Sequence, residues 1–271
     1  MNLHPDSRYQ LLLASLITDG ERTHNRTAVD AATLFCPPPL EFRPAHQFPL
    51  LTTKRMFWRG IVAEMLWFIS GDTDVTTLQR QGIRFWDEWQ QPDGTIGPGY
   101  GASMRAYSDG TGRVVDQLAE FVNGIRNDPA SRRHILTLWN PLRTGEMALP
   151  PCHGDYVQAH VEGDMLDLAV VSRSQDVFLG LPFNIAGWSL FHLMLAQVTG
   201  IAAGRLVYHP MNAHLYVNHV DAAREQLSRT PFASPMVTLD TNITEMWDFR
   251  PEHIHLHNYR HHDPIPAPVA V

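Results

Sequence analysis

The sequence predicts a single α+β domain spanning residues 1–271. Segments with helical spacing of apolar residues are mixed with short alternating segments, and the two kinds do not follow the regular strand–helix–strand order of a parallel α/β fold. No repeat, low-complexity run or linker divides the chain. With 44% hydrophobic and 18% charged residues, the composition is that of a globular protein with enough apolar side chains for a large core.

Five segments have apolar residues at the three- and four-residue spacing of a helix. Gly20 and Gly71 follow the first two segments as stop signals, and Asn127-Asp128-Pro129 follows the third. The fourth segment is apolar on nearly every side, which predicts a helix in the core. The expected helices cover residues 6–18, 55–70, 114–125, 184–199 and 213–227.

Short segments of alternating apolar and polar residues predict strands. The expected strands cover residues 134–139, 157–161 and 165–171. The last two are separated by Glu162-Gly163-Asp164, which is typical of a hairpin turn. Strands and loops are also expected over residues 21–53, and strand-like structure towards the C-terminus. Residues 90–112 are rich in Gly, Pro, Asp and Ser and predict a long loop, which in a compact domain is often functional.

Charge and cysteine content narrow the class of protein. The formal net charge is −7 and there is no dense block of Lys or Arg, which disfavours a dedicated nucleic-acid binder. The most hydrophobic stretch, residues 185–198, contains polar residues and is shorter than the roughly 20 residues that a membrane span needs. The first residues lack the charged and apolar regions of a signal peptide, so we expect a cytoplasmic protein whose only cysteines, Cys36 and Cys152, are reduced.

Cys152 lies in a Leu-Pro-Pro-Cys-His segment (149–153), and Arg173 begins the run Arg-Ser-Gln-Asp-Val-Phe-Leu-Gly-Leu-Pro-Phe-Asn (173–184). A thiol near a positive charge can act as a nucleophile, and a guanidinium is suited to binding phosphate. Together the motifs favour covalent chemistry on a phosphorylated small molecule. A lone cysteine is, however, most often a small buried apolar residue, and the spacing alone leaves both interpretations open.

Further motifs occur in order along the chain: Leu-Leu-Thr-Thr-Lys-Arg (50–55), Glu-Met-Leu-Trp-Phe (64–68), Phe-Trp-Asp-Glu-Trp (85–89), Gly-Pro-Gly-Tyr-Gly (97–101), Asp-Pro-Ala-Ser-Arg-Arg (128–133), Ala-His-Leu-Tyr-Val-Asn-His (213–219) and Ala-Pro-Val-Ala-Val (267–271). With the two motifs above, they resemble the thymidylate synthase family over nearly the whole chain. Its members are folate-dependent enzymes that place one carbon on C5 of a pyrimidine nucleotide. The resemblance implies a large mixed β-sheet with flanking helices, a homodimer formed sheet to sheet with shared active sites, and 5,10-methylenetetrahydrofolate as co-substrate without a metal.

The resemblance implies catalytic roles for four residues. Cys152 would add to C6 of the pyrimidine, which makes C5 a carbon nucleophile. Glu64 would relay protons through ordered water, and Tyr100 would lie near C5 for proton removal. His153, beside the nucleophile, completes the expected catalytic group.

The resemblance also implies a set of phosphate ligands. Arg26, Arg173 and Ser174 would hold the 5′-phosphate of the nucleotide through charge-assisted hydrogen bonds. Arg132 and Arg133 would reach the same phosphate from a partner subunit. The simpler interpretation of the Arg132-Arg133 pair, without the resemblance, is a solvated helix end.

Asn184 is expected to recognise the base, because a carboxamide can donate to O4 and accept from N3–H of uracil, whereas an aspartate would favour cytosine. A simpler interpretation of Asn184 is the N-cap of the helix over 184–199. His214 and Tyr216 would bind the 3′-hydroxyl of the sugar. The expected substrate is dUMP or a related pyrimidine nucleotide, with deoxyribose favoured over ribose.

Four residues are implied to bind the folate. Asp176 would hold the pterin, and Trp86 and Leu149 would pack against it. The carboxylate of Val271 would help to close a lid that excludes water. Judged without the resemblance, Trp86 is more simply a core aromatic residue.

The chain departs from the family pattern at several positions. Members that make thymidylate usually carry Arg-Thr-Gly-Thr-Gly in the phosphate loop, where residues 26–30 are Arg-Thr-Ala-Val-Asp. The usual Tyr-Gln before the Arg-Ser pair is Val171-Ser172, and the usual Gly-Asp before the sugar-binding histidine is Met211-Asn212. Tyr-Gly-x-Gln-Trp-Arg becomes Tyr-Gly-Ala-Ser-Met-Arg at 100–105. One residue is inserted after the cysteine motif, which brings Asp155 close to the nucleophile.

These departures narrowly favour a dUMP hydroxymethylase. After one-carbon transfer, hydride from the folate gives a methyl group on C5, whereas water gives a hydroxymethyl group. Small side chains at 171 and 172, with the polar Asp155 nearby, favour the admission of water and predict 5-hydroxymethyl-dUMP. The alternative is reductive methylation to dTMP, the thymidylate synthase reaction, and Asn184 weighs against a cytidylate hydroxymethylase.

Two further hypotheses belong to other classes of function. His253, His255 and His257 alternate and would share one face of a strand, where three imidazoles can bind zinc, although a polar surface strand is favoured. A non-catalytic nucleotide- or RNA-binding relic is disfavoured, because binding alone needs neither a nucleophile nor a proton relay.

Overall fold

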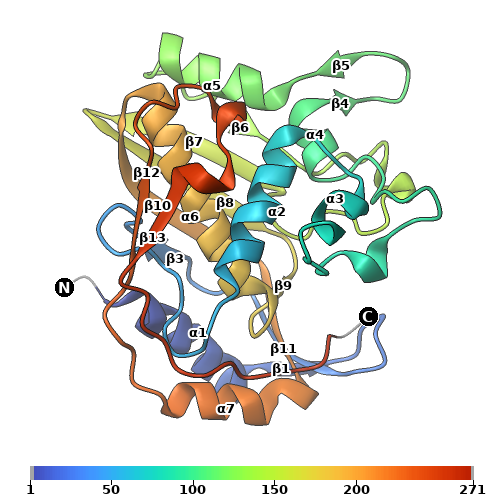
Figure 1. Ribbon diagram of the computed structural model, residues 1–271. Coiled ribbons are helices and arrows are strands. Elements are labelled where there is room, and N and C mark those ends of the chain that lie inside the picture. Colours follow the sequence, from blue (N-terminus) through green and yellow to red (C-terminus); the bar gives the residue numbers. More distant parts are fainter. Residues whose placement is uncertain (1–2, 270–271) are drawn as a thin grey trace.

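The computed structural model describes residues 3–269 and confirms a mixed α+β architecture with flanking helices (Figure 1). The helices are α1 (Pro5–Asp19), α2 (Trp58–Ser70), α3 (Val75–Gln79), α4 (Gly101–Arg105), α5 (Gln117–Asn127), α6 (Gly180–Thr199) and α7 (Val220–Ser228). The short 3₁₀ helices are η1 (Asp87–Trp89), η2 (Thr144–Glu146), η3 (Val217–His219), η4 (Met246–Asp248) and η5 (Pro251–His253). The strands are β1 (Glu21–Thr23), β2 (Ala31–Phe35), β3 (Leu40–Phe42), β4 (Tyr107–Ser108), β5 (Val114–Val115), β6 (Ile135–Leu136), β7 (Tyr156–Glu162), β8 (Met165–Ser172), β9 (Gln175–Asp176), β10 (Ala202–Pro210), β11 (Asn212–Tyr216), β12 (Met236–Leu239) and β13 (Ile254–His257).

Two mixed sheets replace the single large sheet that the sequence led us to expect. A five-stranded sheet has the order β3-β10-β8-β7-β6, and a four-stranded sheet has the order β1-β2-β11-β9. The parallel pair β8 and β10 leads directly into the parallel pair β9 and β11, so one sheet continues into the other. At the transition the Met211 amide donates to the Ser172 carbonyl at 2.8 Å. This bend places Arg173 and Ser174 between the two sheets.

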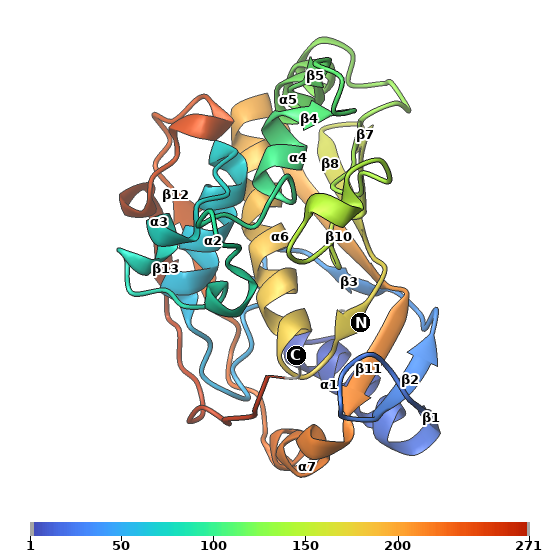
Figure 2. The same ribbon diagram turned by 90° about the vertical axis from the view of Figure 1, so that its right-hand side faces the viewer.

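Helix α6 runs through the middle of the molecule, between α2 and strand β10 (Figure 2). It is apolar on all sides and fills the core, as predicted. It begins at Gly180, four residues before the predicted start, and Pro182 is tolerated because the first turn of a helix has no intrahelical acceptor for its N–H groups. Leu179 is the N-cap, so the interpretation of Asn184 as the N-cap is wrong.

The predicted helix over 213–227 is also wrong in its first half. Residues of β11 alternate between buried and half-buried, because Ala213 and Leu215 point into the core while the strand pairs with β2 and β9. The chain turns through η3, and α7 begins only at Val220. The apolar spacing in this segment is compatible with both periods, and the pairing partners decide for the strand.

Other boundaries shift for local reasons. Helix α5 begins at Gln117 because Asp116 caps it, accepting from the Ala119 amide at 3.0 Å, and the preceding residues pair as β5 with β4. The expected long loop over 90–112 contains α4 and β4 and is therefore wrong in part. Helix α2 starts at Trp58 instead of residue 55, and only Ile135–Leu136 of the expected strand 134–139 is extended.

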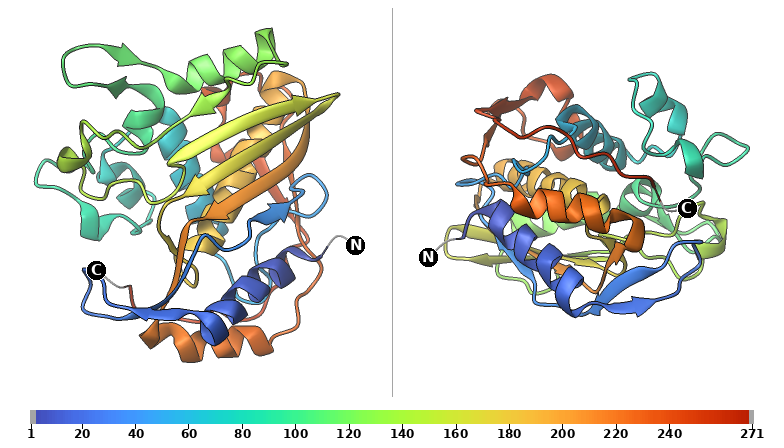
Figure 3. Two further views of the ribbon diagram at one scale, coloured as in Figure 1. Left: turned by 180° about the vertical axis from the view of Figure 1, so that it is seen from behind. Right: turned by 90° about the horizontal axis from the view of Figure 1, so that it is seen from below.

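The predicted hairpin is confirmed, with β7 and β8 joined through Gly163 in a left-handed backbone conformation (φ 63°). Side chains of β8 alternate between buried and half-buried. Seen from behind, the face of this sheet that points away from α6 is not covered by a helix (Figure 3, left). Exposed apolar side chains at this sheet include Ile135 and Tyr156.

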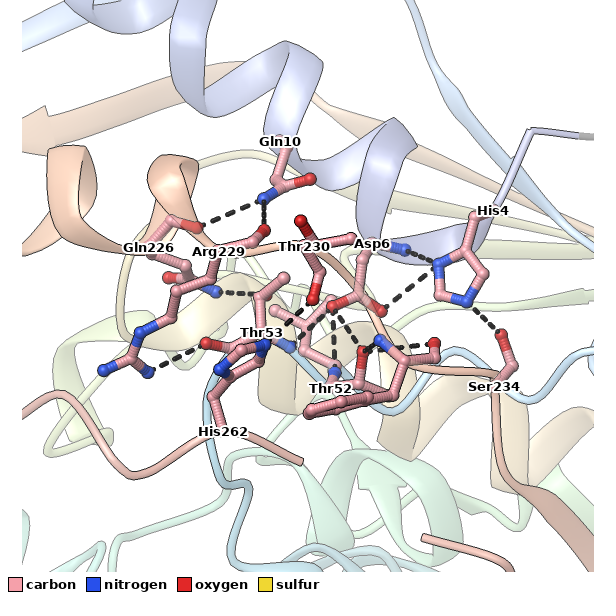
Figure 4. Close-up of polar contacts among 12 residues, drawn as sticks. His4, Asp6, Gln10, Thr52, Thr53, Gln226, Arg229, Thr230, Ser234 and His262 are labelled. Carbon is pink, nitrogen blue, oxygen red and sulfur yellow. Dashed lines mark hydrogen bonds and ion pairs between the residues drawn. The ribbon is translucent and has the colours of Figure 1, made fainter. Parts of the chain in front are cut away.

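A buried polar network, here named the Asp6 network, ties the N-terminal helix to the segment before α2 (Figure 4). The Asp6 carboxylate accepts from the Thr52 amide at 2.9 Å and from the Thr53 amide at 2.8 Å. Gln226 of α7 donates to the Thr53 hydroxyl at 3.0 Å and accepts from Tyr9 of α1 at 3.4 Å. Helices α1 and α7, which both carry residues of this network, lie side by side (Figure 3, right).

Candidate active site

The candidate nucleophile, Cys152, lies in the loop between η2 and β7 and is half-buried. Its Sγ lies 3.5 Å from the hydroxyl of Tyr100, and its amide donates to the same hydroxyl at 3.1 Å. Burial raises the pKa of the Cys152 thiol, against the opposing effects of Tyr100 and Arg173. Arg173 lowers this pKa, but burial outweighs its effect, and the thiol needs a base or a change of surroundings to ionise.

Tyr100 is held rigidly beside the thiol. It is fully buried, its ring stacks on Phe68 with centroids 4.8 Å apart, and Trp86 packs against it edge-on at 5.1 Å. Its backbone has φ 41°, a left-handed conformation that is strained for a bulky residue and persists because packing enforces it. Burial raises the pKa of Tyr100 well above its usual value, so the phenol is a proton donor beside the thiol.

Glu64 of α2 carries a carboxyl that is tuned for proton transfer. Trp86 Nε1 donates to its Oε1 at 2.8 Å, and burial raises the pKa of Glu64 to about 7, while the bond from Trp86 opposes this shift. A carboxyl with a pKa near neutrality can both accept and release a proton under ordinary conditions. Trp86, expected to contact the folate, is itself buried, and its indole holds Glu64 in place.

His153 faces the core and not the open side of the loop. Its ring is buried, and its Nδ1 accepts from Trp188 Nε1 of α6 at 3.1 Å. Burial lowers the pKa of His153 to about 4, so the imidazole is neutral near pH 7. The geometry suits a residue that supports the cysteine loop rather than one that exchanges protons with a bound ligand.

Next to the thiol lies a second cluster, which we name the Gln175 cluster and which consists of Gln175, Ser172, Tyr208 and Asn184. Gln175 Oε1 accepts from Tyr208 at 2.7 Å, from Ser172 at 2.9 Å and from Asn184 Nδ2 at 3.3 Å. Ser172 Oγ also lies 2.7 Å from the Cys152 carbonyl, which links the cluster to the nucleophile loop. No role for Gln175 or Tyr208 was predicted from the sequence.

The expected phosphate ligands lie on several elements. Arg173 is exposed, its guanidinium donates to the carbonyls of Pro151 at 2.7 Å and Pro150 at 3.0 Å, and it lies over the ring of Trp139. The amide of Ser174 donates to the Cys152 carbonyl at 3.4 Å, which keeps this part of the bend beside the nucleophile.

The remaining arginines lie further from the thiol. Arg26 is exposed on the loop between β1 and β2, and its charge acts on Tyr216, so the two lie close together. Arg132 and Arg133 are exposed just before β6 and form no ion pair with any residue between 3 and 269. The fold thus places Arg173 and Ser174 at the cysteine loop, Arg26 near Tyr216, and the Arg132-Arg133 pair at the start of β6.

Asp155 closes the nucleophile loop from the β7 side. Its Oδ2 accepts from the Arg173 amide at 2.7 Å, whereas its buried Oδ1 makes no hydrogen bond within the described chain, and Arg173 Nε lies 3.7 Å away. Burial raises the pKa of Asp155 to about 6, and its negative charge contributes to the raised pKa of Cys152. The expected proximity of Asp155 to the nucleophile is confirmed.

Strands β9 and β11 place three expected ligand-binding residues together. Asp176 and His214 are paired in register, and the rings of His214 and Tyr216 have centroids 5.2 Å apart. Asp176 Oδ1 accepts from the amides of Phe178 and Leu179 at 2.9 and 3.0 Å. Burial lowers the pKa of His214, which favours the neutral ring.

Lys54 adds a buried amine to the site, and the sequence motifs do not assign it a role there. Its Nζ donates to the Phe178 carbonyl at 2.6 Å, and burial lowers its pKa to about 7, opposed by the charge of Asp176. Leu149 is half-buried beside Gly99, at the approach to Tyr100. Val271 lies outside the described residues.

Histidines at the C-terminal strand form separate contacts. His255 Nε2 lies 2.7 Å from Asp240, His257 Nε2 lies 2.7 Å from Thr238, and His253 belongs to η5 and not to the strand. No group of three or more His, Cys, Asp or Glu side chains in residues 3–269 is arranged to hold a metal ion. Nor does any helix in that range have the length and apolarity to cross a bilayer.

Comparison with known families agrees with this geometry. The model of the family described as Thymidylate synthase matches residues 7–271, nearly the whole chain. The chain therefore belongs to the thymidylate synthase family, which confirms the resemblance seen in the motifs. Membership implies folate-dependent transfer of one carbon to C5 of a pyrimidine nucleotide, with methylenetetrahydrofolate as the usual co-substrate.

Proposed function

From membership in the thymidylate synthase family, we propose that this chain transfers one carbon to C5 of dUMP and releases 5-hydroxymethyl-dUMP. Cys152 adds to C6 and forms the covalent adduct, while Tyr100, with its hydroxyl 3.5 Å from the thiol, lies where the C5 proton leaves. Glu64, with a pKa of about 7, relays protons to and from the base. Asn184 binds the base, and His214 and Tyr216 bind the sugar.

The folate co-substrate supplies the one-carbon unit when it is bound, and the residues present fit it. Asp176 Oδ1 is fixed by two backbone amides, whereas Oδ2 has no partner in residues 3–269 and can accept from N–H groups of a pterin. Leu149 is only half-buried and offers an apolar contact. Lys54, held at the Phe178 carbonyl, places an amine with a pKa of about 7 near Asp176.

The observation that carries the hydroxymethyl product is the unpartnered oxygen of Asp155. A buried carboxylate oxygen without a hydrogen bond is a site for an ordered water molecule. A carboxyl with a pKa of about 6 can take a proton from that water at neutral pH. Water held here would add to the methylene group on C5 in place of hydride, giving the hydroxymethyl nucleotide. Reductive methylation to dTMP is the competing outcome.

Mass spectrometry of the product formed from dUMP and methylenetetrahydrofolate tests the proposal. A product heavier than dUMP by CH₂O, without dihydrofolate, is expected. A product heavier by CH₂, with one dihydrofolate per turnover, would establish thymidylate synthase activity instead. Asp155→Asn should shift the product ratio towards methyl, whereas Asp164→Asn, a matched change at the exposed turn between β7 and β8, should leave that ratio unchanged.

We further propose that the active form is a homodimer built on the uncovered face of the five-stranded sheet (Figure 3, left). Exposed Tyr156 and Ile135 lie at this sheet, and the exposed Arg132-Arg133 pair is free to reach a phosphate bound by a second protomer. Light scattering should give twice the protomer mass. Mixing Cys152→Ser with Arg132→Ala should restore part of the activity if sites are shared, and no recovery would contradict sharing.

A further inference from the structure

We infer that Gln175 fixes the orientation of the Asn184 carboxamide and thereby decides which pyrimidine the site accepts. The inference rests on the proposed function, because it takes Asn184 to face the base. A carboxamide carries an oxygen acceptor on one side and an NH₂ donor on the other. Uracil presents a donor at N3 and an acceptor at O4, whereas cytosine presents an acceptor at N3 and a donor at the amino group on C4. An asparagine whose amide can rotate by 180° can therefore bind either base.

Gln175 is itself held in one orientation. It is fully enclosed, with 1% of its surface exposed, and its Nε2 donates to the Asp176 carbonyl at 3.2 Å. Its Oε1 accepts from Tyr208 at 2.7 Å and from Asn184 Nδ2 at 3.3 Å. Turning the Gln175 amide over would bring its oxygen against the Asp176 carbonyl and leave the Asn184 NH₂ facing another NH₂.

Helix α6 leaves room for the two amides to meet. A Cβ added at Gly180, the first residue of α6, would lie 3.2 Å from Gln175 Nε2 and 3.8 Å from Asn184 Nδ2. A side chain at Gly180 would therefore crowd the Gln175 amide. The Asn184 NH₂ is directed to Gln175, while Asn184 Oδ1 makes no hydrogen bond in the described chain and is left as an acceptor.

The locked orientation is the one that suits uracil. Ser172 bridges Gln175 to the Cys152 carbonyl, so Gln175 lies on the nucleophile side of Asn184. In the proposed adduct the bond from Cys152 to C6 fixes the base, so the same edge of the ring always meets Asn184. In the proposed function O4 meets the Asn184 NH₂, and N3–H meets its Oδ1. Cytosine would require Asn184 Oδ1 to face Gln175 Oε1, two acceptors with no proton between them.

Calorimetric binding of dUMP and of dCMP to the full chain tests this assignment. The wild type is expected to prefer dUMP, and Gln175→Met, which removes the acceptor at similar volume, should lower the dUMP-to-dCMP affinity ratio by about tenfold or more. Gln175→Asn has a side chain shorter by one methylene, so its amide ends further from Asn184, and it should lower the affinity ratio in the same way.

The matched control is Gln226→Met, the same change at a fully buried glutamine of the Asp6 network (Figure 4). It should lower the melting temperature and leave the affinity ratio unchanged. Equal losses of affinity for both nucleotides in Gln175→Met and Gln175→Asn would overturn the inference alone. A wild type that binds no dUMP would overturn the proposed function, and the inference with it.

Discussion

Two buried polar networks in this protein differ in what their residues surround. In the Asp6 network Oδ2 of the carboxylate accepts from the Thr52 and Thr53 amides, and Gln226 joins Tyr9 to the same segment, so the network connects α1, α7 and the segment before α2. Asp6 Oδ1 makes no hydrogen bond among the described residues and lies 3.5 Å from His4 Nδ1. Asp155 Oδ1 and Asn184 Oδ1 also lack a hydrogen bond among those residues, but they belong to the groups around the candidate nucleophile. We therefore expect the Asp6 network to hold the frame and the groups around Cys152 to meet a ligand.

The pKa values of buried groups also differ between the Asp6 network and the groups around Cys152. Burial raises the pKa of Glu64 to about 7 and that of Asp155 to about 6, which is the range in which a carboxyl exchanges protons at neutral pH. In the Asp6 network, burial instead raises the pKa of Tyr9 well above its usual value, so this phenol stays neutral at that pH. The substitutions below test whether chemistry and stability divide along this line.

The largest expected effect is the loss of turnover in Cys152→Ser. Without the thiol no adduct forms at C6, and turnover of dUMP should fall on the order of 10⁵-fold. The free energy of unfolding should change by less than about 1 kcal/mol, because the loop around residue 152 keeps its backbone contacts. Steady-state kinetics and urea unfolding measure the two quantities. A variant that retains a tenth of wild-type turnover would contradict the nucleophile assignment.

Asp6→Ala should have the opposite profile. It removes the shared acceptor of the Thr52 and Thr53 amides and leaves both buried and unpaired, which should lower the free energy of unfolding by about 4 kcal/mol. Urea unfolding measures the loss, with Asp19→Ala, an exposed residue at the other end of α1, as control. The folded fraction should bind dUMP as the wild type does. A weaker affinity without a loss of stability would mean that this network belongs to the site.

The sequence predicted elements that depend on local contacts better than elements that depend on distant ones. Helix α1, the β7–β8 hairpin and the buried helix α6 follow from local periodicity, and all three were found. Strand β11 was mistaken for helix because its identity depends on pairing with β2 and β9, which are distant in sequence. Local patterns report burial on one face but not the neighbour that covers it.

In the candidate site, residues that lie in sequence motifs could be predicted. Residues that matter only because distant segments of the chain meet could not. Cys152, Tyr100 and Glu64 lie in recognisable segments, and the structure brings Tyr100 against Cys152. Gln175 and Tyr208 acquire their importance only because β9 and β10 meet beside α6. The sequence offered one signal for Tyr208. It is a polar side chain within a mostly apolar strand, β10, and such a residue needs a hydrogen-bond partner when it is buried.

Glu64→Gln tests the groups around Cys152 through the pH dependence of the free energy of unfolding. The folded pKa of about 7 lies above the ordinary 4.5, so the unfolded chain loses this proton first, and the wild type loses stability relative to the variant as pH rises from about 4.5 to about 7. The difference in unfolding free energy should change by about 3 kcal/mol over that window. Urea unfolding at several pH values measures it.

The pH dependence of turnover should depend on the same proton of Glu64. If Glu64 delivers protons from its neutral form, wild-type activity falls as pH rises above about 7, and the inflection disappears in Glu64→Gln. Asp6→Ala, which does not touch the site, should keep the inflection. Identical pH profiles for wild type and Glu64→Gln would remove Glu64 from the proton relay.

The smallest effects sharpen the comparison most, because one chemical change can be made in both networks. Tyr9→Phe removes a bond of 3.4 Å to Gln226, and Tyr208→Phe removes a bond of 2.7 Å to Gln175. Each should lower the free energy of unfolding by about 1 kcal/mol, measured by urea unfolding. Only Tyr208→Phe should also weaken dUMP binding, because it loosens the amide that holds Asn184. Equal effects of the two variants on binding would mean that the networks are not divided between frame and chemistry.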